Sequence, residues 1–131
     1  MQYFTALVHK DEGSAYGLSF PDLPGAFAAA DDWNSIPKAA TEALDLWFED
    51  MPNVEPAALD DIRKRPEIAA ELASGAVLMP VPYIPADTAT ERVNITIERG
   101  LLRAIDETAK ARGMTRSSFI ASATRHELVG A

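Results

Sequence analysis

The chain has 131 residues, of which 47% are hydrophobic, and it carries a formal net charge of −8. This length suits one ordinary domain or two small ones, and the hydrophobic content is sufficient for real cores. Cysteine is absent, which excludes disulfides and thiolate metal sites and suits a reducing cytoplasm. No segment approaches the ~20 apolar residues of a membrane span, and the N-terminal residues lack the pattern of a signal peptide, so we expect a cytoplasmic protein.

The first half of the chain predicts a small sheet followed by a helix. Tyr3–His9 and Ala15–Phe20 are rich in aromatic and β-branched residues and are separated by a turn that contains glycine, which predicts a hairpin. Ala26–Ala30 reads as a third, weaker strand. From Ser35 to Asp50 the apolar residues recur at helical spacing, so we expect a helix there.

The segment that follows is irregular and rich in proline. Residues 57–74 predict one or two short helices, and Ala76–Met79 predicts a closing strand at an edge or next to the hairpin. Prolines at 80, 82 and 85 predict a stiff, extended exit over Pro80–Pro85. Residues 87–91 are polar and read as a linker.

Apolar and polar residues then alternate strictly over Arg92–Glu98. One face of this predicted strand carries Val93, Ile95 and Ile97, and the other face carries Arg92, Asn94, Thr96 and Glu98. A lone short strand must find a partner. The same strand of a second copy would give a two-stranded antiparallel ribbon, which fits the major groove of B-DNA, where arginine and asparagine read base edges. The pattern therefore predicts a dimeric DNA-binding ribbon.

Two helices are predicted after this strand. The first covers Leu101–Arg112 and ends at Gly113, which stands where a C-cap glycine would. Thr115 can cap the second helix. The start Thr115-Arg116-Ser117 offers free backbone N–H groups, hydroxyls and a guanidinium, which together suit a DNA phosphate.

Arg92–Leu128 resembles a ribbon-helix-helix domain of the Arc and MetJ type, on the strand, the first helix, the glycine turn and the Thr-Arg-Ser helix start. The resemblance implies that Arg92, Asn94 and Thr96 contact bases, and that Thr115, Arg116 and Ser117 contact phosphates. It also implies a homodimer through the ribbon, with pairs of dimers forming a tetramer on adjacent half-sites. The alternative is an edge strand and helical hairpin used only for dimerisation.

The string Ser19-Phe-Pro-Asp-Leu-Pro-Gly25, followed by the Ala39–Leu44 helix and a ribbon-helix-helix tail, resembles the HicB antitoxin family. The resemblance implies an α+β protein: a partial RNase H-like βββαβ domain over residues 1–86, a linker over 87–91 and a ribbon-helix-helix domain over 92–131. It also implies a type II antitoxin that binds a small basic HicA toxin, an mRNA-cleaving ribonuclease, and that represses its operon at operator DNA.

The charge distribution fits two modules with different partners. Residues 1–86 hold five basic and 14 acidic residues, a net charge of −9, whereas residues 87–131 hold seven basic and six acidic, a net charge of +1. The acidic module should favour a basic partner. A surplus of carboxylates that only solubilises the chain is the alternative. The candidate toxin contacts are Asp22, Leu23, Asp31, Asp32 and Trp33.

Other functions have weaker support in the sequence. An RNase H-type nuclease needs carboxylates that converge on two metal ions from the middle of strands, whereas Asp11, Glu12, Asp22 and Asp31 fall in predicted turns and strand ends. Two distant histidines make a poor metal site, and no phosphate loop or nucleophile motif is present. We therefore expect no catalytic residue, metal or cofactor. A repressor with a small-molecule-sensing N-terminal domain is the alternative function, and it would need a polar pocket.

Overall fold

The computed structural model describes residues 1–85, 87 and 89–130. The chain divides into two compact units, which comprise mainly residues 1–86 and residues 87–128 and are described separately below. No helix among the described residues is long and apolar enough to cross a membrane.

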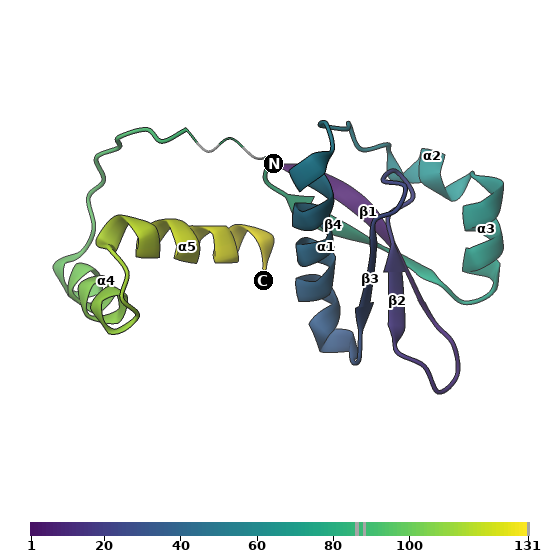
Figure 1. Cartoon of the computed structure of the whole chain (residues 1–131), viewed down its shortest axis with the longest axis horizontal. Helices are drawn as coiled ribbons and strands as arrows, with labels where there is room; N and C mark the ends of the chain where they lie inside the picture. Colours follow the sequence, from purple (N-terminus) through teal and green to yellow (C-terminus); the bar gives the residue numbers. More distant parts are fainter. Residues whose placement is uncertain (86, 88, 131) are drawn as a thin grey trace. The chain divides into compact units, whose positions relative to one another are not determined.

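The N-terminal unit is a mixed α and β structure in which a four-stranded antiparallel sheet carries helices on both faces (Figure 1). In chain order its strands and helices are β1 Gln2–Lys10, β2 Tyr16–Ser19, β3 Phe27–Ala30, α1 Ile36–Asp50, α2 Leu59–Arg63, α3 Pro66–Ala73 and β4 Val77–Tyr83. A 3-10 turn over Trp33–Ser35 precedes α1. The three strands and the long helix predicted for residues 3–50 are confirmed within two residues at each end.

The strand order is β3-β2-β1-β4, so β1 is central and β4 lies at an edge. β1 pairs with β2 in the register Leu7 to Ser19, and with β4 in the register Leu7 to Leu78. The predicted end of the closing strand at Met79 is wrong, because β4 continues through Pro80 and Pro82 to Tyr83. An edge strand tolerates proline where the missing N–H would face away from its neighbour.

The main core lies between one face of the sheet and α1, which lies along that face (Figure 1). Alternate residues of β1 point into it, and α1 adds residues at intervals of four, as the two periodicities require. The innermost side chains are Phe4, Ala6, Val8, Leu18, Val81, Ile36, Ala40 and Leu44. Each buried leucine, isoleucine or phenylalanine contributes about 1.5–3 kcal/mol by leaving water.

A second, smaller core covers part of the opposite face. Leu7 points the other way from its neighbours Ala6 and Val8, and it packs with Ile62 of α2, Ile68 of α3 and Ala76. The irregular segment between α1 and β4 therefore has a structural role, because it shields the second face of the sheet.

The C-terminal unit contains two helices, α4 Arg99–Ala111 and α5 Arg116–Val129. Gly113 has a φ of 67°, and the N–H groups of Gly113 and Met114 donate to the carbonyls of Lys110 and Ala109 at 3.1 and 2.8 Å. This pattern is the Schellman C-cap, which favours glycine. The predicted glycine turn between the two helices is thus confirmed.

Residues 92–98 pair with no strand in the described part of the chain and have no regular secondary structure. The predicted ribbon requires the same segment of a second copy, and the structure contains a single chain. The ribbon therefore stays a prediction. The segment's polar residues are exposed in the single chain, and on its apolar face Val93 is 72% exposed and Ile95 is 61% exposed.

Candidate functional site

The Phe20–Ala26 turn, which carries the most specific sequence motif, is held from inside the N-terminal unit. The N–H of Phe20 donates to the carbonyl of Ala26 at 3.3 Å, and the N–H of Leu23 donates to the carbonyl of Phe20 at 2.9 Å. The side chain of Leu23 is fully buried in the main core. Gly25 has a φ of 88°, which a side chain at this position would disfavour.

Asp22 joins this turn to the segment that covers the second face of the sheet. One carboxylate oxygen accepts a hydrogen bond from Nη2 of Arg65 at 2.7 Å, and the other accepts from the N–H of Ala57 at 2.9 Å. The Asp22 side chain is only 9% exposed. Hydrogen bonds to a charged group contribute about 1.5–3 kcal/mol when they are shielded from water.

The same turn is also anchored to α1. Nε1 of Trp47 donates to the carbonyl of Pro24 at 3.0 Å. The motif residues of this turn therefore contribute to the fold: of the predicted toxin contacts, Leu23 is buried and Asp22 is hydrogen-bonded within the unit.

The other three predicted toxin contacts lie at the surface, directly after β3. Asp31, Asp32 and Trp33 are all exposed, and Trp33 is 57% exposed. Asp32 caps the following turn, because its Oδ1 accepts from the N–H and from the hydroxyl of Ser35 at 2.9 and 3.0 Å. The carboxylate of Asp31 and the indole of Trp33 remain available to a partner.

An aromatic and cationic stack supports Trp33. Its ring meets the ring of Tyr16 edge to face, with centroids 5.8 Å apart. Nζ of Lys10 lies 5.3 Å from the centroid of the Tyr16 ring. Phe27, at the start of β3, is 73% exposed. The sequence assigned Phe27 to a strand and gave no signal that its ring points to solvent.

A groove of about 560 Å³ lies along β1 and β4 beside α2 and α3. Its lining is largely apolar and includes Tyr3, Leu59 and Val77, with Thr5 and Arg63 among its polar residues. A small-molecule sensor would need a polar pocket, whereas the lining of this groove is largely apolar.

In the C-terminal unit the start of α5 has the predicted cap. Oγ1 of Thr115 accepts a hydrogen bond from the N–H of Ser118 at 3.1 Å and donates to its hydroxyl at 2.9 Å. Ser117 is exposed. Arg116 is not free: its Nε and Nη2 each lie 2.8 Å from a carboxylate oxygen of Asp106 on α4. These hydrogen bonds, reinforced by charge, lower the pKa of Asp106 and raise that of Arg116.

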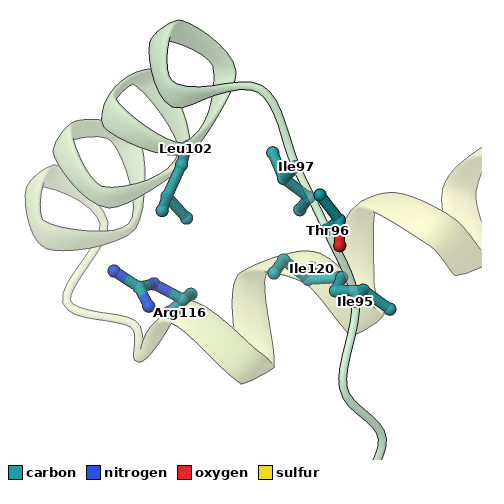
Figure 2. A pocket seen from close by; sticks show the side chains of 6 residues that line it. All are labelled: Ile95, Thr96, Ile97, Leu102, Arg116 and Ile120. Carbon is teal, nitrogen blue, oxygen red and sulfur yellow. The ribbon is translucent and has the colours of Figure 1, made fainter.

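The predicted base-contacting residues Arg92, Asn94 and Thr96 are all exposed. Beside them the unit has an open hollow of about 360 Å³. Figure 2 shows the apolar side chains of Ile97, Leu102 and Ile120 gathered around this hollow together with Arg116. Within the described residues of this unit, Ala109 is the one buried hydrophobic residue.

Among the described residues, no group of three or more histidine or carboxylate side chains is arranged to hold a metal ion.

A family model described as the HicB-like antitoxin of bacterial toxin–antitoxin systems matches residues 4–124. The crystal structure of the antitoxin HicB of Burkholderia pseudomallei is 30% identical to this chain, covers 98% of it and 99% of its own length, and has a TM-score of 0.55. This chain belongs to the HicB-like antitoxin family.

Two further solved structures match part of the chain. The N-terminal domain of the Burkholderia pseudomallei antitoxin HicB is 27% identical, with a TM-score of 0.51, and covers 64% of this chain and all of its own. A structure of a HicA3 and HicB3 toxin–antitoxin complex is 23% identical, with a TM-score of 0.53 and the same coverage, and shows likeness of fold. A search of curated proteins finds no significant match.

The family assignment gives the buried motif a meaning. Within the Phe-Pro-Asp-Leu-Pro-Gly string, the Asp22 carboxylate and the Pro24 carbonyl accept hydrogen bonds from other parts of the N-terminal unit. These contacts show that the string contributes to the fold of the N-terminal unit.

Proposed function

We propose that this antitoxin neutralises a HicA-like, mRNA-cleaving toxin by binding it through the N-terminal unit, and that it represses its own operon through the C-terminal unit. The observation that carries the proposal is the family match over residues 4–124, which spans both units. The likeness of fold to an antitoxin solved with its toxin supports the partner. No catalytic step is assigned to this chain, and the cytoplasm, where messenger RNA and operator DNA are found, is the proposed location.

The acidity of the N-terminal unit supports a basic partner. Its net charge of −9 over residues 1–86 would draw a basic ribonuclease towards it and repel nucleic acid. The exposed Asp31 and Trp33 combine charge with a rigid aromatic surface, as interface anchors do. We assign toxin contact to Asp31, Asp32 and Trp33. The observed order of three strands, a helix and a closing strand supports a partial RNase H-like fold for this domain, residues 1–86.

The small core of the C-terminal unit supports a dimer. Two helices and a seven-residue segment bury only Ala109 completely, and Val93, Ile95, Leu101 and Leu128 stay exposed. A second copy that pairs along residues 92–98 would cover Val93 and Ile95 and fill the hollow beside Leu102. The alternation of the segment then puts Arg92, Asn94 and Thr96 of both copies on the opposite face, towards DNA.

The phosphate contact is proposed for the helix start as a whole. Ser117 is exposed at the first turn of α5, and the backbone N–H groups there favour an anion. Arg116 would have to share its guanidinium between Asp106 and a phosphate. A domain boundary at residues 87–91 lets each unit engage its own partner.

The test is a growth-rescue assay with the small basic protein encoded by the adjacent reading frame. We expect that its induction stops growth, and that co-expression of either the full chain or residues 1–86 restores growth. Residues 1–86 contain both hydrophobic cores, so they can fold without the rest. Residues 87–131 are the matched control and should not rescue. A toxic neighbour that the soluble full chain neither binds nor neutralises would refute the proposal.

A further inference from the structure

The two edges of the sheet differ in what they offer to another strand. At the β4 edge, Pro80 and Pro82 lie two residues apart, so both belong to the same side of the strand. Proline has no N–H to donate. An intact ladder with β1 therefore requires that the backbone nitrogens of these two residues point away from β1. This edge lacks two donors in succession and is therefore blocked to strand addition.

The β3 edge has no such block. The N–H of Phe20 donates to the carbonyl of Ala26, which makes these two residues a hydrogen-bonded pair at the end of the β2–β3 ladder. Hydrogen-bonded and open pairs alternate along an antiparallel ladder. Ala28 and Ala30 therefore bond to β2, whereas Phe27 and Ala29 direct their N–H and C=O groups outwards. No described strand lies on that side of β3.

The side chains around this edge favour contact with a second protein. β3 is short and, apart from the exposed ring of Phe27, it carries only methyl groups, so an incoming backbone can approach closely. Asp31 and Asp32 follow the strand directly and are exposed. The edge thus combines unpaired backbone groups, an apolar side chain and negative charge within six residues.

We propose that the β3 edge receives an extended segment of the basic toxin as a fifth strand, with Phe27 packing against an apolar side chain and Asp31 meeting a lysine or arginine. The inference rests on the proposed function and names the surface used. Backbone hydrogen bonds would supply affinity, and the flanking side chains would supply specificity. A second copy is the poorer occupant, because it would bring together two units that each carry a net charge of −9 over residues 1–86.

The test compares two substitutions at one position in the full chain. Ala29→Pro removes the outward N–H and places a ring in the path of the added strand, whereas Ala29→Thr keeps the N–H and suits a strand. Binding to the small basic protein of the adjacent reading frame is measured by calorimetry. We expect Ala29→Pro to weaken binding at least ~10-fold and Ala29→Thr to leave it within about twofold.

Amide exchange followed by NMR gives an independent readout. In the free chain the amides of Phe27 and Ala29 should exchange quickly and those of Ala28 and Ala30 slowly, and the toxin should protect the first pair. A tight complex in which Phe27 and Ala29 still exchange freely, and to which Ala29→Pro binds as wild type, would overturn the strand addition and leave the antitoxin function intact. Loss of the wild-type interaction itself would instead count against the proposed function. Protection in the free chain, together with a smaller particle for Ala29→Pro, would show that the edge pairs two copies and would also overturn the proposal.

Discussion

Replacing Asp22 by alanine tests whether the family motif holds the two layers of the N-terminal unit together. The substitution removes the acceptor for the N–H of Ala57 and the partner of Arg65. A shielded donor left without an acceptor costs about 1–3 kcal/mol, and a hydrogen bond to a charged group contributes about 1.5–3 kcal/mol. Because the Arg65 side chain is 32% exposed, water replaces part of what it loses. We therefore expect a loss of about 2–3 kcal/mol.

The assay is thermal unfolding followed by tryptophan fluorescence, since Trp47 donates to Pro24 in the same turn. For a domain of this size each kcal/mol lowers Tm by about 4–8 °C, so Tm should fall by about 10–20 °C. Asp60→Ala is the matched control, because its carboxylate is 83% exposed and lies 4.0 Å from Arg63. It should change stability by less than about 0.5 kcal/mol. Equal effects of the two substitutions would show that Asp22 does not join the layers.

Three further outcomes are expected in the C-terminal unit. Because the Arg116 hydrogen bond lowers the pKa of Asp106 below its ordinary value of 3.8, the stabilisation is full above that value and is lost as the pH falls through the lower folded value. Circular dichroism of thermal unfolding between about pH 5 and pH 2 should show this loss in wild type and its absence in Asp106→Asn. Gly113→Ala should lower the free energy of unfolding by about 1 kcal/mol, because Gly113 has a positive φ. Gly100→Ala within α4 is the control and should be neutral or stabilising by up to about 1 kcal/mol. Equal effects of the two substitutions in urea unfolding would contradict the C-cap assignment. Asn94→Ala should reduce the preference for operator over random DNA by about 1–3 kcal/mol in titrations at fixed salt, and a wild type without such preference would remove Asn94 from base recognition.

The sequence predicted the elements whose evidence is local. The aromatic and β-branched residues of β1, the apolar spacing in α1 and the glycine after α4 each act through neighbours within a few residues, and each prediction is confirmed. The end of the closing strand was wrong, because whether a proline is tolerated depends on the strand's place in the sheet. That place is set by pairing with β1, which is some 75 residues away in the chain.

The candidate site was harder to predict for a related reason. Asp22 looked like a surface carboxylate in a turn, and only the fold brings Arg65 and Ala57 to it. Arg116 looked free at a helix start, and only the crossing of α4 and α5 brings Asp106 to its guanidinium. Conversely, the Phe27 ring is exposed because Ala28 and Ala30 take the face of β3 that meets the main core, and the strand's own sequence does not reveal which face that is. Contacts between distant residues decide which charged and aromatic side chains are left for partners.

Because the two units have cores of unequal size, their folded fractions should respond differently to the concentration of this protein in the cell. The N-terminal unit contains its own hydrophobic interior, so its folded fraction does not depend on how many copies are present. If the proposed dimer forms, a unit whose described residues bury only Ala109 gains stability from association, and mass action then makes its folded fraction rise with concentration. When synthesis slows, the C-terminal unit would open first and expose itself to proteases while the N-terminal unit stays folded. Under the proposed function, release of the operon would then precede release of the toxin.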